Sequence, residues 1–399
     1  MTGVSVTMVV VGLPVLAATL YLLGLTLLSR RSHPQSASAS APTMRFVVVV
    51  PAHNEAAGIA ATVDSLHAVD YPAALRRVVV VADNCTDATA FVARAHGASV
   101  IERHDLTRRG KGYALDHAFA ELLDTAVPLW DAVVVVDADT LVEPSLLQAM
   151  ASELQHAEAA QAAYLPAPGR STPTAVITEV ALTAFHLVRS SARERLGLSC
   201  GLRGNGMAFT RSLLRRVRHT AFSRTEDLEF GVQLGLQGVR VAYAGGTTVY
   251  GDMPDRAEVV TQQRDRWIGG RMLMARRFVG ALLTRAWQTR SALPLDLAVD
   301  LIVPPLSALV ATLAVGLVAA FVVVMAGGSV APLVVWGTAL LALVAHVGHA
   351  AVVAGRGWAL LRAALSLPRY ALDKTWLVAR GVRSTDDTWI RTTREGELS

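Results

Sequence analysis

An uncharged apolar run near the start of the chain most limits what this sequence can fold into. The run extends from Val4 to Leu28, and Arg30 and Arg31 follow it. A helix of ~20 apolar residues is long enough to cross the hydrocarbon core of a bilayer. No basic residue precedes the run, as one would in a secretory signal peptide, so we expect a permanent membrane span. Because cytoplasmic flanks carry an excess of Arg and Lys, the pattern predicts an external N-terminus and a cytoplasmic continuation after the span.

The same apolar character returns in the last third of the chain. Leu297 to Met325 and Ala331 to Ala354 are two further candidate spans, and we expect Pro304-Pro305 to kink the first of them. The chain is 52% hydrophobic and only 17% charged, against roughly 25% charged residues in ordinary soluble proteins. These features predict a multi-pass protein of the cell (inner) membrane. The predicted parts are a membrane helix at 1–31, a linker at 32–43, a cytoplasmic domain at 44–267, an interfacial segment at 268–294, two membrane helices at 295–355, and an interfacial basic helix with a C-terminal tail at 356–399.

Net charge and cysteine content exclude several other classes of protein. The chain has a net charge of +5 and 2 cysteines, so neither a disulfide scaffold nor a cysteine-based zinc site is expected. Its arginines lie mainly beside the apolar segments, without the interleaved aromatic residues that stack on bases. We therefore expect a lipid bilayer, and no nucleic acid, as a partner.

Between the first two candidate spans, the chain has the pattern of an α/β domain with a mostly parallel sheet. Short valine-rich runs, typical of strands buried on both faces, alternate with helix-like segments. The predicted strands are Phe46–Val50, Val78–Val81 and Val133–Val136, and the predicted helices are Gly58–Leu66, Ala88–His96 and Tyr113–Leu123. In open α/β sheets, ligands bind beyond the carboxyl ends of the strands. The residues that follow each strand are therefore the first candidates for a site.

Polar residues follow all three predicted strands. The segments are Pro51-Ala52-His53-Asn54-Glu55, Ala82-Asp83-Asn84-Cys85-Thr86-Asp87 and Asp137-Ala138-Asp139-Thr140. Two carboxylates two residues apart, where a strand leaves the sheet, can bind Mg²⁺ or Mn²⁺ together with substrate phosphates. The alternative for an isolated Asp-x-Asp is a polar turn at the end of a strand. The sequence contains neither the Gly-x-Gly-x-x-Gly pattern of a dinucleotide site nor a Walker A pattern.

Two further segments carry charged candidates. Lys111 lies between two glycines after a pair of arginines, where it can contact a phosphate; the alternative is a solvated basic loop. In Thr225-Glu226-Asp227, a carboxylate that reaches an acceptor hydroxyl is a candidate general base. The alternative there is a helix N-terminus that Thr225 caps, with acids in its first turn.

The segment Gln263-x-x-Arg266-Trp267 lies at the predicted end of the α/β domain. Arg266 can neutralise a leaving diphosphate, and Trp267 can stack on the apolar face of a sugar. The alternative is an anchor of Arg and Trp at the membrane surface. Asn205, in a glycine-rich loop, can help to shape an acceptor site or belong to an ordinary turn.

Two pairs of ionisable residues lie in or beside the predicted spans. His346 and His349 stand three apart in the third span; they are functional candidates or neutral side chains hydrogen bonded between helices. Asp296 and Asp300 stand one turn apart at the entry to the second span. They mark the membrane interface or line a path for the acceptor.

Taken in order, six motifs resemble those of the membrane-bound family-2 inverting glycosyltransferases, which have a GT-A fold. The motifs read PAHNE, VADNCTD, RGKGYALD, VVVVDADT, TEDLEF and QQRDRW, and they lie between Met44 and Trp267. The group includes cellulose, hyaluronan and poly-N-acetylglucosamine synthases, and enzymes that glycosylate membrane lipids. The resemblance implies a GT-A nucleotide-sugar-binding domain with a mostly parallel sheet, about three transmembrane helices and amphipathic interface helices. One departure is Cys85, where many members have a serine.

The resemblance also assigns roles to matching residues. Asp83 would recognise the base and ribose, Asp139 would bind the metal, and Asp227 matches the general base. With Asn205 added from its loop, the predicted sets are Pro51, Ala52, Asn54, Glu55, Asp83, Asn84, Lys111, Asp137 and Ala138 for the nucleotide sugar, Asp139 for Mg²⁺ or Mn²⁺, Asp227, Glu226 and Arg266 for catalysis, and Asn205, Gln263 and Trp267 for the acceptor.

These roles imply transfer of a sugar from a nucleoside-diphosphate sugar, with UDP as the expected nucleotide, to a membrane-associated glycan or lipid in β-linkage. The complete QxxRW motif favours a polysaccharide synthase. The few spans and the basic interfacial flanks favour an enzyme that adds one or a few sugars to a lipid. A third hypothesis is a membrane scaffold or transport subunit whose α/β domain only binds nucleotide. A small membrane partner subunit is included among the expected partners.

Overall fold

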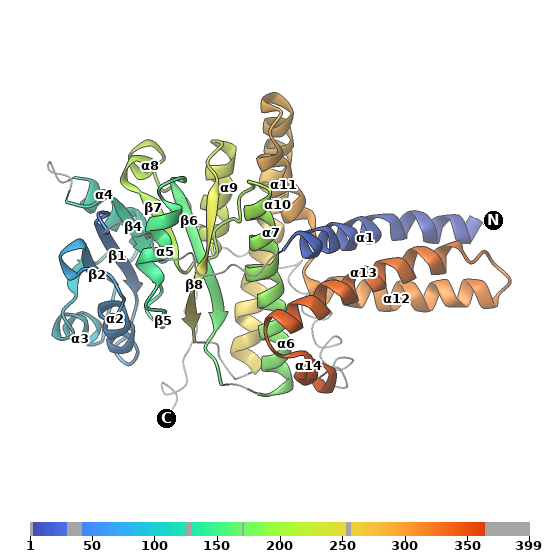
Figure 1. Cartoon of the computed structure of the whole chain (residues 1–399), viewed down its shortest axis with the longest axis horizontal. Helices are drawn as coiled ribbons and strands as arrows, with labels where there is room; N and C mark the ends of the chain where they lie inside the picture. The colour runs from blue at the N-terminus through green and yellow to red at the C-terminus, as the bar shows by residue number, and fades with distance from the viewer. Residues whose placement is uncertain (1–2, 30–41, 125–128, 170, 253–256, 364–399) are drawn as a thin grey trace. The chain divides into compact units, whose positions relative to one another are not determined.

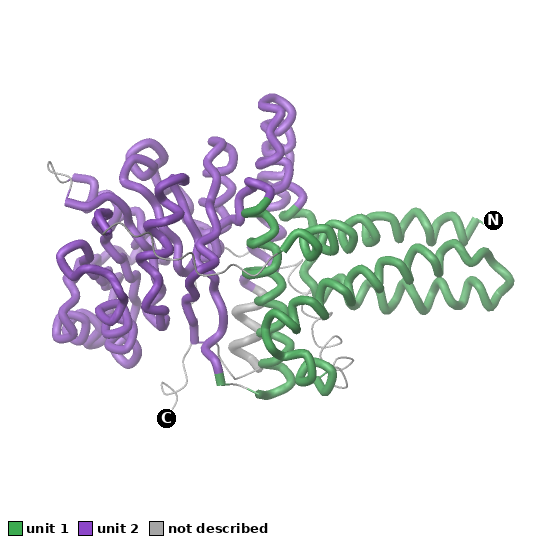
Figure 2. The backbone as a smooth tube through the Cα atoms, viewed as in Figure 1, with its two compact units in different colours: residues 1–31, 169–195, 300–385 green, residues 32–168, 196–299, 386–399 purple. Residues whose placement is uncertain are grey.

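The chain divides into two units, which are considered one at a time (Figure 2). Unit 1 comprises residues 1–31, 169–195 and 300–385, and unit 2 comprises residues 32–168, 196–299 and 386–399. The computed structural model describes residues 3–29, 42–124, 129–169, 171–252 and 257–363, without the side chains of 257–265. Arg30 and Arg31, most of the predicted linker and the predicted C-terminal tail lie outside these residues. The predicted domain boundaries stay predictions.

Unit 2 contains an eight-stranded sheet in the order β3-β2-β1-β4-β7-β6-β8-β5 (Figure 1). The strands are β1 Phe46–Ala52, β2 Arg76–Asp83, β3 Ser99–Arg103, β4 Ala132–Val135, β5 Thr140–Val142, β6 Ala159–Pro166, β7 Met207–Thr210 and β8 Val241–Gly251. β3, β2, β1 and β4 are mutually parallel, and β6 is parallel to β8. β7 is antiparallel to β4 and β6, and β5 is antiparallel to β8. The prediction of an α/β fold with a mostly parallel sheet is confirmed.

The valine-rich runs form the centre of the sheet because helices cover both of its faces. Val48 and Val50 of β1 share a core with Ile59 and Val63 of α2. α4 also packs against β1 and β2, and the alternate β1 residues, such as Val49, are equally buried. The helical segments of unit 2 are α2 Ile59–His67, η1 Ala73–Leu75, α3 Thr89–Ala95, α4 Lys111–Leu123, α5 Leu146–Glu153, α8 Arg211–Arg216, α9 Glu226–Leu236 and α10 Ala257–Thr289; α11 Ala292–Ile302 continues into unit 1.

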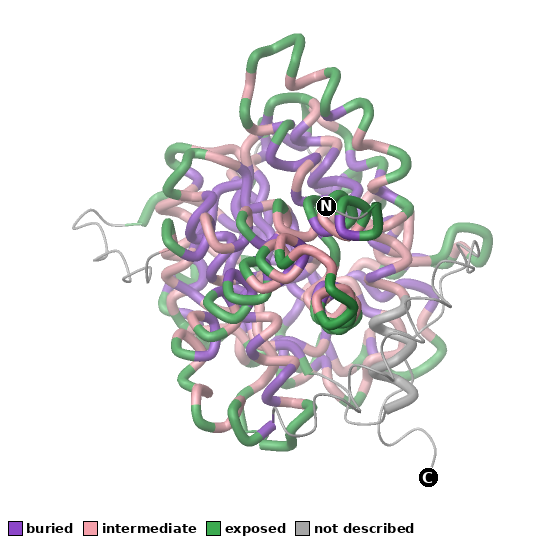
Figure 3. The backbone as a smooth tube through the Cα atoms, turned by 90° about the vertical axis from the view of Figure 1, so that its right-hand side faces the viewer, coloured by how far each residue is buried: buried purple, intermediate pink, exposed green. Residues whose placement is uncertain are grey.

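Three helices of unit 1 are long and apolar enough to cross a membrane: α1 Gly3–Leu28, α12 Leu306–Met325 and α13 Ala331–Val353. α1 packs against both α12 and α13. Only 17% to 33% of their most apolar windows is buried, and Figure 3, which faces the N-terminal end of α1, shows exposed backbone close to that end. Apolar helices that leave so much surface uncovered suit a lipid environment. The remaining helical segments of unit 1 are α6 Pro173–Leu182, the π-helix η2 Thr183–Val188, α7 Arg189–Arg195 and α14 Gly357–Ala363.

One prediction about the spans is wrong. Pro304 and Pro305 do not kink a single helix that begins at Leu297 but separate α11 from α12, and Pro305 is the residue before the first turn of α12. Proline has no N–H to donate and clashes with the preceding turn, so two consecutive prolines end a helix rather than bend it. The apolar helix that is long enough to span therefore starts at Leu306.

Polar side chains of the apolar helices are hydrogen bonded to one another. His346 Nδ1 lies 2.7 Å from Thr26 Oγ1, and His349 Nε2 lies 3.1 Å from Ser29 Oγ. These contacts join α13 to the end of α1 and favour the explanation of both histidines as hydrogen-bonded links between helices.

Asp300 is also paired within unit 1. It accepts a hydrogen bond from Arg193 Nη2 at 2.6 Å and forms a second ion pair with Arg189. A buried carboxylate in such a position needs cationic partners, and α7 supplies both.

Candidate active site

The carboxyl ends of β1, β2 and β4 meet at one edge of the sheet of unit 2. Ala52 of β1 is the register partner of Ala82 in β2, and Val49 of β1 is that of Val135 in β4. The three polar segments predicted from the sequence therefore leave the sheet side by side. This edge is where open parallel sheets bind ligands.

Asp83 stands at the end of β2 in a buried network of hydrogen bonds. Its Oδ1 accepts from Arg103 Nη1 at 2.6 Å and from Asn84 Nδ2 at 3.0 Å. Arg103 also donates to Asp105 at 3.1 Å, and its side chain is only 8% exposed. The sequence analysis missed Arg103. Arg103 is the register partner of Asp83 where β3 runs parallel to β2, and the local sequence does not specify this pairing.

The loops after β1 and β2 are hydrogen bonded to each other. Asn54 Oδ1 accepts from the backbone N–H of Thr86 at 2.7 Å, and the Sγ of Cys85 accepts from that of Asn54 at 3.4 Å. Asn54 and Asn84 both have positive φ, 55° and 52°, which asparagine tolerates better than most residues. Burial raises the pKa of the Cys85 thiol, so the thiol stays a neutral hydrogen-bonding group between the loops.

Backbone groups of these segments also take part in the site. Pro51 and Ala52 are the last residues of β1. The Glu55 N–H donates to Thr89 Oγ1 at 2.7 Å. Ala138 is buried, and its carbonyl accepts from Thr62 Oγ1 at 2.8 Å.

Lys111, at the start of α4, connects the strand end to the helix that carries the predicted base. Its Nζ lies 2.5 Å from Asp137 Oδ1, donates to the carbonyl of Gly204, and lies 3.7 Å from Glu226 Oε1. Burial acts to lower the pKa of Lys111. The nearby carboxylates, Asp137 first, outweigh burial and raise that pKa to about 12. Lys111 is therefore a fixed cation, rather than part of a solvated loop.

Asn205 is fully buried and contacts Asp137, the partner of Lys111 in this ion pair. Its Oδ1 accepts from the backbone N–H of Asp137 at 3.2 Å, and its Nδ2 donates to Thr140 Oγ1 at 2.7 Å. Gln161 holds the same loop, since its Nε2 donates to the Asn205 carbonyl at 2.7 Å and its Oε1 accepts from the Arg203 N–H at 2.8 Å. In this structure Asn205 orients the Asp-x-Asp segment; its acceptor contact stays a prediction.

Glu226 and Asp227 form the first turn of α9, where a helix favours negative charge. Burial raises the pKa of Glu226 to about 7, although Lys111 acts to lower it. Burial also raises the pKa of Asp227, and Lys111 again opposes the shift. Thr225 occupies the capping position, but its side chain forms no capping hydrogen bond. The motif thus places two adjacent carboxyl groups with raised pKa values beside one lysine.

Tyr164, near the end of β6, is a second residue that the sequence analysis missed. Burial, followed by the negative charges of Asp137 and Asp139, raises the pKa of its hydroxyl. Gly251 of β8 leaves room for the ring, since a Cβ at that position would lie 2.6 Å from the Tyr164 oxygen. The neutral hydroxyl is hence a hydrogen-bonding group beside the Asp-x-Asp segment. The only indication in the sequence was that a side chain with a hydroxyl group stands in an apolar strand.

The last motif lies on α10. Arg266 and Trp267 are both partly buried, and Arg266 is near enough to Glu226 to act on its pKa, which it lowers. Arg266 therefore belongs to the same cluster as Glu226. The side chain of Gln263 lies outside the described residues.

A divalent cation fits the carboxylates at the end of β4 only with help from a substrate. Within the described ranges, no group of three or more His, Cys, Asp or Glu side chains is arranged to hold a metal ion. Asp137 and Asp139 supply carboxylate oxygens, and Asp137 is already paired with Lys111. Mg²⁺ and Mn²⁺ sites of one or two carboxylates take their remaining ligands from water and substrate phosphates, and this donor set fits that type.

Comparisons with known proteins identify the family of the chain. Residues 42–270 match the model of the family described as "Glycosyltransferase like family 2". A probable glycosyltransferase of Bacillus subtilis, YdaM, is 22% identical over 242 residues, which are 58% of this chain. The matched part is 56% of that relative's length.

Two solved structures are similar to different extents. The mannosyltransferase PcManGT from Pyrobaculum calidifontis, in complex with GDP-Man and Mn²⁺, has a TM-score of 0.55 at 20% identity, covering 91% of this chain and 97% of that chain. Glucosyl-3-phosphoglycerate synthase from Mycobacterium tuberculosis, with Mn²⁺ and UDP, covers 61% of this chain and 80% of that chain at 22% identity and a TM-score of 0.40. The first likeness supports the fold, and the family match covers more than half of the chain. The chain belongs to glycosyltransferase family 2, with a GT-A nucleotide-sugar-binding fold.

Proposed function

We propose that the protein is an inverting glycosyltransferase that moves a sugar from a nucleoside-diphosphate sugar to a membrane-associated acceptor in β-linkage. The observation that carries the proposal is the position of Lys111, whose Nζ lies 2.5 Å from Asp137 Oδ1 and 3.7 Å from Glu226 Oε1. One cation thus contacts two parts of the proposed site. One part is the strand end, where a diphosphate would bind, and the other is the pair of carboxyl groups that would receive a proton.

The donor side of the site binds the nucleotide. The carboxylate of Asp83, oriented by Arg103 and Asn84, accepts hydrogen bonds from the base or ribose. The linked loops that contain Asn54 and Glu55 form the adjacent wall. Lys111 and Arg266 provide positive charge for the departing diphosphate, and such fixed charges act most strongly where water is excluded. UDP is our expected nucleotide, and the GDP-Man complex of the archaeal mannosyltransferase makes GDP the one to test beside it.

The acceptor side activates the nucleophile. Asp227 takes the proton of an acceptor hydroxyl, which attacks the anomeric carbon from the face opposite the nucleotide; the bond from that carbon to the diphosphate oxygen breaks. A single displacement inverts the anomeric centre, so an α-linked donor gives a β-linkage. Glu226, whose pKa is raised to about 7, lies next to the base, and Gln263 and Trp267 contact the acceptor sugar. A base with a raised pKa is well matched to proton transfer near neutral pH.

Asp139 would hold Mg²⁺ or Mn²⁺ together with the donor phosphates. When bound, the ion neutralises negative charge that develops on the diphosphate. The carboxylate of Asp139 lies two residues after Asp137, in a segment that Asn205 fixes by accepting from the Asp137 N–H.

The acceptor is a membrane lipid or a growing glycan, because three helices are long and apolar enough to span a bilayer. We place unit 2 in the cytoplasm and the N-terminus outside, in the cell membrane. Reporter fusions at the N-terminus and after α13 test this topology. Activity of an external-only reporter after α13 would contradict it.

A donor screen tests the proposed activity. The purified full chain is incubated with Mg²⁺, Mn²⁺ or EDTA and with UDP-glucose, UDP-N-acetylglucosamine, UDP-galactose, UDP-glucuronate or GDP-mannose, in the presence of native membrane lipids. We expect release of the nucleoside diphosphate from one donor class, loss of release in EDTA, and recovery on adding the metal. Nucleotide binding without release from any donor would favour the membrane scaffold or transport subunit instead.

The product size distinguishes two kinds of acceptor. With a radiolabelled donor, a ladder of polymers would indicate a polysaccharide synthase. A single lipid-soluble species would indicate an enzyme that adds one or a few sugars to a lipid, which the few apolar helices favour.

A further inference from the structure

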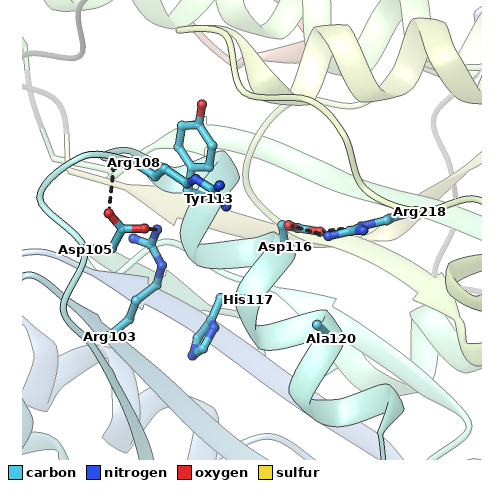
Figure 4. Close-up of a pocket in the computed structure, with 8 residues that line it drawn as sticks. All are labelled: Arg103, Asp105, Arg108, Tyr113, Asp116, His117, Ala120 and Arg218. Carbon is cyan, nitrogen blue, oxygen red and sulfur yellow. Dashed lines mark hydrogen bonds and ion pairs between the residues drawn. The ribbon is translucent and has the colours of Figure 1, made fainter.

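The segment that leads into α9 is fastened to α4 by two pairs of side chains. The rings of Tyr113 and Phe222 are stacked, with centroids 4.3 Å apart and planes 7° from parallel. Arg218 donates from Nε and Nη2 to the two carboxylate oxygens of Asp116, each at 3.2 Å. We call the Tyr113–Phe222 and Asp116–Arg218 pairs the α4 latch. Figure 4 shows its α4 residues and Arg218, with the ion pair between Asp116 and Arg218 dashed.

A glycine lets the two segments approach each other closely. A Cβ on Gly112 would collide with the Ala221 carbonyl and lie 3.2 Å from the Cα of Phe222. The backbone of α4 therefore touches the segment directly, one residue after Lys111. The latch continues this contact for one more turn of α4.

The latch connects the two segments that carry Lys111 and Glu226, whose separation matters for the proposed reaction. α4 begins with Lys111, and α9 begins with Glu226, four residues after Phe222. Beyond the latch, the Ser223 N–H donates to Glu229 Oε2 at 3.1 Å. The segment is thus held at both ends, and its path sets where the first turn of α9 stands relative to Lys111.

One side of the latch is open to solvent. The side chain of Arg218 is 76% exposed, and Phe222 is 38% exposed. Tyr113, Asp116 and Arg218 line a cavity of about 230 Å³ (Figure 4), so open space rather than packed core adjoins the contact. Exposed ion pairs stabilise folded proteins weakly. If the latch only stabilised the fold, removing it would therefore leave activity nearly unchanged.

We propose that the α4 latch positions the first turn of α9, with its two carboxyl groups, against Lys111. The inference rests on the proposed glycosyl transfer. We assign the latch residues no contact with substrate or the reacting atoms, so we describe them as positioning residues. A displacement of about 1 Å in a catalytic arrangement can cost on the order of 10²-fold in rate. The latch therefore affects turnover more than donor binding, which depends on Asp83 and the strand ends.

The test compares a double variant with conservative and matched controls. Tyr113→Ala with Arg218→Ala removes both pairs, whereas Tyr113→Phe with Arg218→Lys keeps a stacking ring and a cation. Arg216→Ala is the matched control, because Arg216, the last residue of α8, forms an exposed ion pair of two hydrogen bonds with Glu158, at 2.8 and 2.6 Å. Steady-state kinetics use the full chain and the donor on which the wild type is active.

We expect the alanine double variant to lose about tenfold or more in kcat with less than a twofold change in donor KM, a separation that marks transition-state rather than ground-state effects. The conservative double variant should recover most of kcat, and Arg216→Ala should match the wild type. A kcat within twofold of wild type in the alanine variant, or an equal loss in Arg216→Ala, would overturn the proposal.

Hydrogen exchange gives a measurement that needs no turnover. Amides of residues 217–225 should exchange faster in the alanine double variant than in Arg216→Ala, while the melting temperature stays close to that of the wild type. Unchanged exchange would refute the latch whether or not the chain is active. A wild type that releases nucleoside diphosphate from no donor would instead refute the proposed function, and the exchange experiment would still test the latch.

Discussion

The donor side and the acceptor side of the candidate site use the same residue types in opposite ways. On the donor side, Asp83 and Asp137 each have a cationic partner, Arg103 at 2.6 Å and Lys111 at 2.5 Å. On the acceptor side, Glu226 and Asp227 are adjacent and partly buried, and both depend on that same Lys111. Burial raises the pKa values of both acceptor-side groups. Paired carboxylates serve as fixed hydrogen-bond acceptors, whereas crowded ones are prepared to take a proton.

The largest expected effect comes from removing the proton acceptor. Asp227→Asn keeps the shape of the side chain but cannot accept the hydroxyl proton, and general bases typically contribute 10² to 10⁴ in rate. We expect transfer to fall by about 10³-fold, with nucleotide affinity by calorimetry within a few-fold of wild type. Asp70→Asn, on an exposed carboxylate of the same unit, serves as the control. Near-normal turnover in Asp227→Asn would remove the base assignment and the distinction between the two sides.

A smaller effect is expected on the donor side. Arg103→Gln removes the cation that orients Asp83, so donor KM should rise roughly tenfold while kcat changes little, as expected when binding is lost equally in the ground and transition states. The control is Arg77→Gln, an exposed arginine on the preceding strand whose Nε donates to Ser99. If Arg103→Gln lowered kcat and left KM unchanged, Arg103 would belong to the catalytic step instead.

The two sides also differ in how far the sequence predicted them. The donor side follows from local pattern, because buried strands must end at one edge and the residues after them, such as Asp83 and Asp137, must gather there. Arg103 and Tyr164 were missed because their places depend on strand pairing, β3 against β2 and β6 against β8, which no local pattern specifies. Asn205 was assigned to the acceptor, yet it is fully buried. Its carbonyl accepts a hydrogen bond from Gln161 Nε2, and its side chain contacts the Asp-x-Asp segment.

Outside the site, the three helices that are long and apolar enough to span a membrane were predictable for the same local reason. Their apolar runs are long and uncharged, so α1 and α13 match the predicted spans closely. The break at Pro304-Pro305 was misjudged because the length of an apolar run says nothing about whether one helix or two will contain it. Likewise, the pairing of Asp300 with Arg189 and Arg193 joins segments more than a hundred residues apart.

The pH dependence of transfer tests the acceptor side more finely. Glu226, with a pKa raised to about 7, is ionised only above that pH, where it is a negatively charged partner for Lys111 at 3.7 Å. We expect kcat/KM to fall about tenfold per pH unit below about 7, since that parameter reports groups of the free enzyme. Glu226→Gln should flatten this limb between pH 5 and 7. An unchanged limb in the variant would assign the titration to another group.

The smallest expected effect isolates burial from charge pairing. His219 is buried among Phe119, Phe222 and Phe230, and burial lowers its pKa to about 4 from 6.5. At pH 6 the unfolded chain therefore binds a proton at this residue that the folded chain does not. The stability from the neutral ring is present above pH 6.5 and is lost as the pH falls toward 4.

Between pH 8 and pH 6, this loss amounts to about 1 kcal/mol of unfolding free energy, or about 2–4 °C in melting temperature for a domain of this size. Glu226 acts in the opposite sense, because its raised pKa favours the folded state as the pH falls below 7. The difference between wild type and His219→Phe, measured by intrinsic fluorescence at both pH values, separates the two. His219→Phe should lack the acid-side loss that the wild type shows. Equal pH slopes would mean that burial at this position does not hold the imidazole neutral. They would also weaken the argument that burial is the main cause of the raised pKa values of Glu226 and Asp227.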